Sequence, residues 1–246
     1  MEAAPERFGR NVAVLIPAYE PDQRLVAFVQ SLSRHFARIV LVNDGSTRGL
    51  GFFESSRPFV ETIIVHSENR GKGAALKTAL VALGEGIDVV TADADGQHAV
   101  EDVVRVAEAL KTHREGLVLG VRDLRFGHIP FRSWWGNAWT VWTLYLLTFR
   151  RFRDTQTGLR GFPAPVIPQL LALPGDRYDY ELATLASVRR FHWPVFELPI
   201  RTIYSPGNST SHFSPIKDSL RNFRTLACLT FKFSRRGIAV RRFFMV

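Results

Sequence analysis

The first half of the chain alternates short apolar segments with segments of helical periodicity, and this alternation constrains the fold more than any other feature. The apolar segments, rich in Val, Ile and Leu, are residues 12–16, 39–42, 62–65, 88–92 and 117–121. Apolar residues recur at helical spacing in between, over residues 25–32, 74–83 and 103–110. Short strands that alternate with helices form parallel sheets covered on both faces. The sequence therefore predicts an α/β fold with a mostly parallel sheet.

The alternation stops at Arg122, and the composition changes after it. Residues 150–165 are polar and contain glycine, which predicts a loop. Residues 180–190 predict a helix, and residues 195–204 predict a strand. No segment is a linker long enough to divide the chain, so we expect residues 1–246 to form one domain.

Residues 134–149 are the longest apolar stretch and are strongly aromatic. They include Trp134, Trp135, Trp139, Trp142 and Tyr145. The stretch is shorter than the roughly 20 residues that a spanning helix needs, and it contains polar residues, so we expect it not to cross a membrane. Its composition predicts an amphipathic helix at a membrane interface. Packing on the sheet as part of the core is the alternative.

Residues 215–246 predict a basic, amphipathic C-terminal segment. From Lys217 onward the chain has eight Lys or Arg residues and one acidic residue, Asp218, with phenylalanines between them. The whole chain has a formal net charge of +9. Such a segment suits an anionic membrane surface. A solvated helix face is the alternative, and nucleic acid is the least favoured partner, so we expect none.

Cysteine usage and the first residues indicate a compartment. The single cysteine, Cys228, excludes an internal disulfide and fits a reducing environment. Residues 1–10 are polar and carry two glutamates, which differs from a signal peptide. We therefore expect a cytoplasmic protein that is peripheral on the cytoplasmic face of the membrane.

Distinctive polar residues follow each predicted strand. Ligands of open parallel sheets bind beyond the carboxyl ends of the strands, and Asp44, Lys72 and Arg122 all lie in or near such positions. The pair Asp93 and Asp95 directly follows residues 88–92. Two carboxylates there can face one hard divalent cation, which takes its other ligands from water and substrate phosphates. The sequence therefore predicts a site for a nucleotide sugar or a similar diphosphate.

With these residues in view, the chain resembles the family 2 glycosyltransferases, which have the GT-A fold, a Rossmann-like sheet flanked by helices. Within them it is similar to polyprenyl-phosphate hexosyltransferases of the dolichyl-phosphate mannose synthase type. The resemblance reaches about Arg224 and is carried by Val14-Leu15-Ile16-Pro17-Ala18-Tyr19, Val42-Asn43-Asp44-Gly45-Ser46, Asn69-Arg70-Gly71-Lys72-Gly73, Asp93-Ala94-Asp95-Gly96-Gln97-His98 and Asp154-Thr155-Gln156-Thr157-Gly158-Leu159-Arg160-Gly161-Phe162. In two places the chain departs from the family pattern: Asn43 replaces a common aspartate, and Pro21 replaces a frequent glutamate.

The resemblance implies a role for each matching position. The residues expected to bind the nucleotide and its phosphates are Pro17, Tyr19, Val42, Asp44, Lys72, Asp93 and Gln97. The metal ligands, for Mg²⁺ or Mn²⁺, would be Asp95 and Gln97 together with Asp93. The residues expected at the reacting groups are Asp93, Asp95, Arg122, Arg132, Asp154 and Arg160.

The implied reaction is the inverting transfer of a hexose from a UDP- or GDP-hexose to a polyprenyl phosphate, either undecaprenyl or dolichyl, at the membrane surface. A phosphate acceptor is ionised near neutral pH, so it needs a cationic clamp and no strong base. The clamp would be Arg122, Arg132 and Arg160. A membrane-anchor protein is a further possible partner.

Two other functions remain open. Transfer to a glycan hydroxyl, in cell-wall or surface polysaccharide synthesis, would need a carboxylate base, for which Asp154, Asp179 and Glu181 are the candidates. Structural roles are equally expected for two of them: Asp154 could cap the following loop, and Glu181 could pair with Arg160. The third function is a basic binding module without catalysis, which would have no use for the aspartate pair.

Overall fold

The structure, a computed structural model, describes residues 7–122, 144–145 and 148–201. The strands are β1 (Phe8–Ala18), β2 (Phe36–Asn43), β3 (Thr62–Val65), β4 (Asp88–Thr91), β5 (Leu117–Arg122), β6 (Arg160–Phe162) and β7 (Val195–Ile200). The α-helices are α1 (Arg24–Ser33), α2 (Leu50–Ser56), α3 (Lys72–Leu83), α4 (Val100–Thr112), α6 (Ile167–Leu171) and α7 (Asp179–Ser187). Short 3₁₀ helices are η1 (Arg57–Phe59) and η3 (Ala164–Val166).

The described strands form one seven-stranded sheet in the order β3-β2-β1-β4-β6-β5-β7. β1 pairs in parallel with β2 and β4, β2 pairs in parallel with β3, and β5 pairs in parallel with β7. The register places Leu15 beside Val40 on one side and beside Thr91 on the other. The predicted α/β fold with a mostly parallel sheet is confirmed, and the carboxyl ends of β1, β2 and β4 meet at one edge.

β6 is the one antiparallel strand of the described sheet, and it was not predicted. It lies between β4 and β5, with Arg160 paired to Thr91 on one side and to Leu119 on the other. The sequence predicted a loop here because three residues are too few to show a period and both partners are distant along the chain. Gly161 lets α4 pack directly on the strand, since a Cβ there would lie 2.9 Å from Val106 Cγ1.

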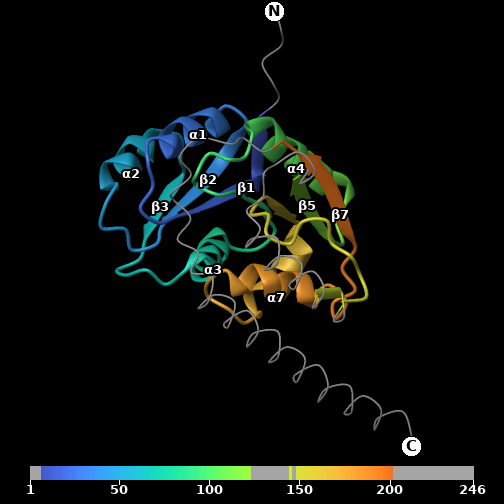
Figure 1. The fold of residues 1–246 in the computed structure, drawn as a ribbon. Coiled ribbons are helices and arrows are strands. Elements are labelled where there is room, and N and C mark those ends of the chain that lie inside the picture. Colours follow the sequence, from blue (N-terminus) through green and yellow to red (C-terminus); the bar gives the residue numbers. More distant parts are fainter. Residues whose placement is uncertain (1–6, 123–143, 146–147, 202–246) are drawn as a thin grey trace, which may run out of the picture.

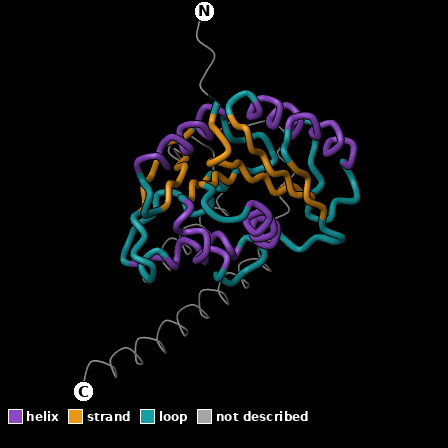
Figure 2. The backbone as a smooth tube through the Cα atoms, turned by 180° about the vertical axis from the view of Figure 1, so that it is seen from behind, coloured by secondary structure: helices purple, strands orange, loops and turns teal. Residues whose placement is uncertain are grey.

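Helices cover both faces of the sheet, with α1, α2 and α4 on one face and α3, α6 and α7 on the other (Figures 1 and 2). The alternation of side chains along β1 divides the core accordingly. Val12, Val14 and Ile16 belong to the cluster on the α1 and α4 face, whereas Ala13 and Leu15 belong to the cluster on the α3 and α7 face.

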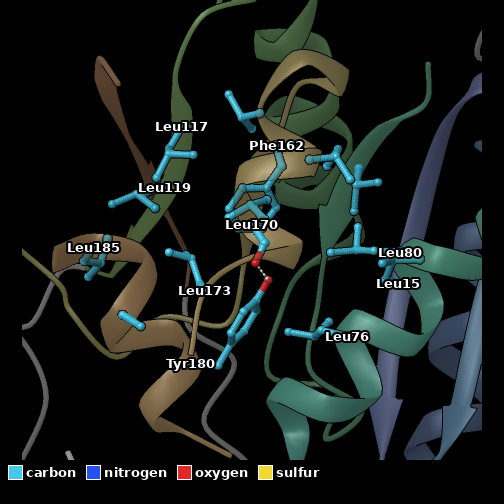
Figure 3. Close-up of a cluster of buried hydrophobic side chains, with 14 of the residues drawn as sticks. Leu15, Leu76, Leu80, Leu117, Leu119, Phe162, Leu170, Leu173, Tyr180 and Leu185 are labelled. Carbon is cyan, nitrogen blue, oxygen red and sulfur yellow. Dashed lines mark hydrogen bonds between the residues drawn. The ribbon is translucent and has the colours of Figure 1, made fainter. Parts of the chain in front are cut away.

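The apolar cluster under α7 fixes the start of that helix (Figure 3). Tyr180 is 3% exposed, and its hydroxyl donates a hydrogen bond to the Leu170 carbonyl at 3.1 Å. Burial raises the pKa of the Tyr180 phenol above its ordinary value. The neutral phenol therefore ties α7 to α6, and the next residue, Glu181, is carried toward α3.

Several expected segments fall partly or wholly outside the described residues. Arg132, Cys228, most of residues 134–149 and all of residues 215–246 lie there, so their expected roles remain predictions. The helix expected over residues 180–190 is α7, and the strand expected over residues 195–204 is β7 within the described part. α2 was not predicted. None of the helices in the described ranges is long and apolar enough to cross a membrane.

Candidate active site

Lys72, the first residue of α3, lies between two carboxylates. Its Nζ donates to Asp93 Oδ1 at 2.5 Å and lies 2.7 Å from Glu181 Oε1. Burial favours the neutral amine, but the charges of Asp93 and Glu181 outweigh burial and raise the pKa of Lys72 above its ordinary value. Lys72 is therefore a fixed cation that joins α3, the turn after β4 and α7.

Asp93 is ionised at the centre of this cluster. Burial alone would raise its pKa, but Lys72 and His98 together hold the pKa well below the ordinary value. His98 Nε2 lies 3.3 Å from Asp93 Oδ2. His98 is 6% exposed, and no role was predicted for it, because nothing local distinguishes a site histidine from a buried core histidine.

Gly158 lies directly against the Asp93 carboxylate. A Cβ at Gly158 would lie 2.5 Å or less from both carboxylate oxygens, so only glycine fits. The Thr91 hydroxyl donates to the Gly158 carbonyl at 2.8 Å and holds the loop in place. The loop before β6 therefore forms one wall around Asp93.

Asp95 has a different electrostatic environment. Burial and then repulsion from Asp93 raise its pKa above the ordinary value. Its Oδ1 accepts the Gln97 amide N–H at 3.0 Å. In the part of the chain that the structure describes, no cationic side chain lies within ion-pair distance of Asp95. Arg24 is nevertheless close enough to be affected: its pKa is raised, first by Asp22 and to a smaller extent by the charge of Asp95.

The donors around Asp95 fit a hard divalent cation. Asp93 and Asp95 repel one another, and carboxylate and amide oxygens are the ligands that Mg²⁺ or Mn²⁺ takes. Across the described ranges, however, no three His, Cys, Asp or Glu side chains gather as a ready-made metal site. A cation here would therefore need water and substrate phosphates to complete its coordination.

Asp44 was expected to contact the nucleotide, but its carboxylate is 3% exposed and holds the polypeptide itself. It accepts the amide N–H groups of Arg70 at 3.0 Å and Gly71 at 2.7 Å. His66 Nδ1 lies 2.8 Å from Asp44 Oδ1. Asp44 thus fixes the loop that ends in Lys72, a role that depends on contacts between distant segments and that sequence alone did not indicate.

The two glycines around Lys72 allow the segment before α7 to approach α3. Gly71 has φ +102°, and a Cβ there would clash with the backbone carbonyl of Asp176. A Cβ at Gly73 would lie 2.5 Å from Tyr180 Cβ. The two glycines of the Gly-Lys-Gly sequence therefore allow close packing of α3 against the start of α7, which places Glu181 beside Lys72.

Arg122 and Asp154 form a bidentate ion pair. Arg122 Nε donates to Asp154 Oδ2 at 2.6 Å, and Nη2 donates to Oδ1 at 3.0 Å. Asp154 is 1% exposed and also accepts the Gln156 amide N–H at 3.0 Å. This geometry matches the structural alternative for Asp154, in which it caps the loop, and it fixes the position of Arg122.

Arg160 lies beneath the site and not in the expected clamp. Its guanidinium is 2% exposed and donates to the carbonyls of Thr157 at 2.9 Å, Glu181 at 2.8 Å and Thr155 at 3.2 Å. The expected pairing with Glu181 therefore uses the backbone of Glu181, while its carboxylate contacts Lys72. A buried guanidinium needs acceptors, and the turns of this loop supply them.

The residues expected at the base and ribose occupy different environments. Val42 is 1% exposed and its side chain lies in the core, so its expected contact with a nucleotide would have to come from its backbone. Pro17 and Tyr19 are half-buried at the end of β1. The next residue, Glu20, has φ +49°, and its N–H donates to Ser46 Oγ at 2.8 Å, which joins the loops after β1 and β2.

Residues 13–166 match the profile of the family described as Glycosyl transferase family 2. The match spans more than half of the chain and includes the site from Pro17 to Arg160. The chain belongs to this family and is a glycosyltransferase.

Curated relatives agree with this assignment. UDP-N-acetylglucosamine–dolichyl-phosphate N-acetylglucosaminyltransferase from Methanococcus voltae is 28% identical over 216 residues, which cover 79% of this chain and 86% of the relative. Polyprenol monophosphomannose synthase from Mycolicibacterium smegmatis is 27% identical over 218 residues, which cover 81% of this chain and 80% of that one.

Solved structures share the fold. Glucosyl-3-phosphoglycerate synthase from Mycobacterium tuberculosis superposes with a TM-score of 0.62 at 18% identity, covering 89% of this chain and 78% of that one. Mannosyl-3-phosphoglycerate synthase from Rubrobacter xylanophilus gives 0.63 at 15% identity, covering 92% and 74%. At these identities the likeness establishes a GT-A-like architecture alone.

Proposed function

We propose that the protein transfers a hexose, with inversion, from a UDP- or GDP-hexose to a polyprenyl phosphate at a membrane surface. One observation carries the choice of acceptor: the three carboxylates considered as a base for a hydroxyl acceptor are already engaged. Asp154 pairs with Arg122, Glu181 contacts Lys72, and Asp179 accepts the Arg177 N–H at 2.9 Å. A phosphate acceptor needs no base, since its second pKa is about 6.

The names of the relatives support the same acceptor. The name of the Methanococcus voltae protein contains dolichyl phosphate, and the name of the Mycolicibacterium smegmatis protein contains polyprenol monophosphomannose. Both relatives match about four-fifths of this chain. We extend that substrate class, and not a particular sugar, to this protein.

The donor diphosphate would lie between Asp95 and Lys72. Asp95 and Gln97, with Asp93, would hold Mg²⁺ or Mn²⁺, which offsets the negative charge that the nucleoside diphosphate gains as it leaves. Lys72 holds the Asp93 carboxylate in place and keeps the positive potential of this edge fixed before substrate binds. Tyr19 and Pro17, at the end of β1, would contact the base or ribose.

Arg122 would bind the acceptor phosphate together with Arg132. Asp154 fixes the guanidinium of Arg122 through two hydrogen bonds, so little side-chain entropy is lost when a phosphate binds. The clamp would hold two anionic groups together and position the acceptor oxygen for attack on the anomeric carbon.

A transfer assay with labelled UDP- and GDP-hexoses, Mn²⁺ and undecaprenyl or dolichyl phosphate tests the proposal. We expect labelled product in the organic phase, and we expect Asp95→Asn to abolish it. Glu85→Gln, which removes a charge from an exposed loop, is the control and should leave transfer unchanged. Labelled water-soluble oligosaccharide with no lipid product would instead support the glycan-hydroxyl alternative.

The site of action follows from the acceptor. We propose a peripheral enzyme on the cytoplasmic face of the membrane, with residues 134–149 and 215–246 as its expected contacts and with an anchor protein as a possible partner. Sedimentation of the purified chain with vesicles, with and without phosphatidylglycerol, tests direct binding. No sedimentation with either vesicle would contradict direct attachment.

A further inference from the structure

A cavity of about 470 Å³, wide open to the surface, lies at the end of α7 that is remote from Glu181. It forms between the chain at residues 148–150 and the turn that leads from α7 into β7. The residues that determine its chemistry are Phe149, Arg150, Arg189, His192 and Trp193. None of the residues placed at the sugar-transfer site lines it.

The cavity is suited to an anion. Arg150, Arg189 and His192 line it, and among the residues that the structure describes no acidic one does. The Nε–H of Arg150 is buried and has no hydrogen-bond partner in the described structure, whereas its Nη2 donates to the Val195 carbonyl at 2.7 Å. A buried N–H without an acceptor is costly, and a shift of the Arg150 side chain toward an anion in the cavity would relieve that cost.

An apolar surface stands beside these cations. Phe149 is 66% exposed, and the Arg189 guanidinium stacks over its ring at 4.5 Å. Trp193 and Val188 form a buried floor. Cationic groups beside an exposed aromatic ring are the composition of a membrane-interface contact.

The backbone is strained at this cavity. Phe149 has φ +55° and His192 has φ +54°, and they are two of three non-glycine residues with positive φ in the described ranges. Left-handed residues cluster at ligand sites, because packing must hold them against their steric cost. Basic residues at a helix C-terminus are also favoured by the helix dipole, but that effect explains neither the exposed Phe149 nor the unpaired N–H of Arg150.

We propose that this cavity binds the phosphate group of an anionic phospholipid, with Phe149 entering the membrane interface beside it. The guanidinium groups of Arg150 and Arg189 contact the phosphate oxygens, and the rings of Phe149 and Trp193 contact the glycerol and acyl region. The site would set the orientation of the enzyme on the membrane. It is separate from sugar transfer and does not depend on the identity of donor or acceptor.

Vesicle sedimentation with purified variants tests this site. Arg189→Glu should weaken binding to vesicles that contain phosphatidylglycerol by roughly tenfold or more, since it replaces a cation near an anionic surface with a carboxylate. Phe149→Ser should weaken binding to the same vesicles. Arg10→Glu makes the same charge change at a residue that is 83% exposed and outside the cavity, and it should have a much smaller effect.

Two outcomes would overturn the proposal. One is equal weakening by Arg10→Glu and Arg189→Glu, which would reduce the effect to net charge. Another is wild-type binding by both cavity variants. In that second case, binding of inorganic phosphate at the cavity, seen by NMR, would show that the cavity takes a free anion and not a lipid. The folding of both variants is checked by their affinity for UDP or GDP, whichever the wild type binds, in the presence of Mn²⁺. This affinity should be unchanged.

Discussion

Gly158 determines how closely the loop before β6 can approach Asp93. Gly158→Ala should displace the Asp93 carboxylate, because the added Cβ would lie 2.5 Å or less from both of its oxygens. A shift of about 1 Å at a reacting site lowers turnover by roughly 100-fold, so we expect kcat to fall by about that factor. Steady-state transfer assays measure the effect, and circular dichroism reports whether the fold is kept.

Gly51→Ala is the matched control. Gly51 lies in α2, and nothing lies within 4 Å of a Cβ at this position. Alanine is favoured over glycine in helices, so this variant should be more stable by about 0.5–1 kcal/mol with unchanged kcat. Equal losses of activity in Gly51→Ala and Gly158→Ala would contradict the role assigned to Gly158.

Asp95 should make cation binding sensitive to acid at a higher pH than an ordinary aspartate would. Burial and the charge of Asp93 raise the pKa of Asp95, and the proton competes with the cation for its carboxylate. Mn²⁺ affinity, measured by calorimetry, should therefore fall as pH falls through the raised pKa. A Mn²⁺ affinity that is constant down to the pKa of a free aspartate would contradict a cation ligand with a raised pKa at this position.

The same shift has a consequence for stability without a divalent cation. A carboxyl with a raised pKa binds its proton more tightly in the folded than in the unfolded chain, so its stabilising effect is lost as pH rises through that pKa. Asp95→Asn should thus melt at a higher temperature than the wild type at neutral pH in chelator. A lower melting temperature would show that the charged form is stabilised, which contradicts the assigned repulsion from Asp93.

For individual residues, the sequence predicted which ones lie together at the candidate site, but it was less informative about the role of each one. The grouping of Lys72, Asp93 and Asp95 at one sheet edge follows from strand ends, which periodicity locates. The inward direction of Val42 and Arg160 does not follow, because it depends on contacts with segments far along the chain. His66 was missed for the same reason.

The junction of α3 and α7 depends on Lys72. Lys72→Met should destabilise the protein by about 2 kcal/mol, because it leaves two partly buried carboxylates without their cation. This cost is smaller than that of breaking a fully buried pair, since solvent screens the partly exposed carboxylates. The double variant Lys72→Met/Glu181→Gln should recover part of this stability but no transfer activity. Urea denaturation gives the free energies of unfolding for the double-mutant cycle.

Lys111→Met controls for the loss of a lysine from a helix. Lys111 is an exposed residue of α4 whose ammonium group lies 5.1 Å from the centre of the Phe8 ring, so its replacement should cost less than about 1 kcal/mol. If Lys72→Met were as stable as Lys111→Met, the two carboxylates would not need the ammonium group, and Lys72 would have no structural role at this junction.

Predictability at the level of elements depended on length and period. The five strands expected in the first half are present as β1 to β5, and the three expected helices are α1, α3 and α4. α2 has seven residues and β6 has three, so neither is long enough to show its period clearly. β6 is defined by the slot it fills between β4 and β5, which only the folded sheet provides.

The charge of the whole molecule should govern its attachment to membranes. The net charge is +9, so binding to anionic vesicles should weaken steadily as salt concentration rises. Sedimentation with phosphatidylglycerol vesicles over a series of NaCl concentrations measures this dependence. Binding that is insensitive to salt would show that apolar insertion dominates and that the basic residues contribute little.

The position of β6 also sets the order in which the sheet can form during synthesis on the ribosome. β4 and β5 share no hydrogen bonds and meet only through β6, which pairs with β4 across 69 residues of sequence in the case of Thr91 and Arg160. A nascent chain can assemble β3-β2-β1-β4 early, but β5 has no place in the sheet until residue 162 has emerged. The loop that forms the wall around Asp93 directly precedes β6, so it also folds late. We therefore expect the nascent chain to be inactive until most of it has been synthesised.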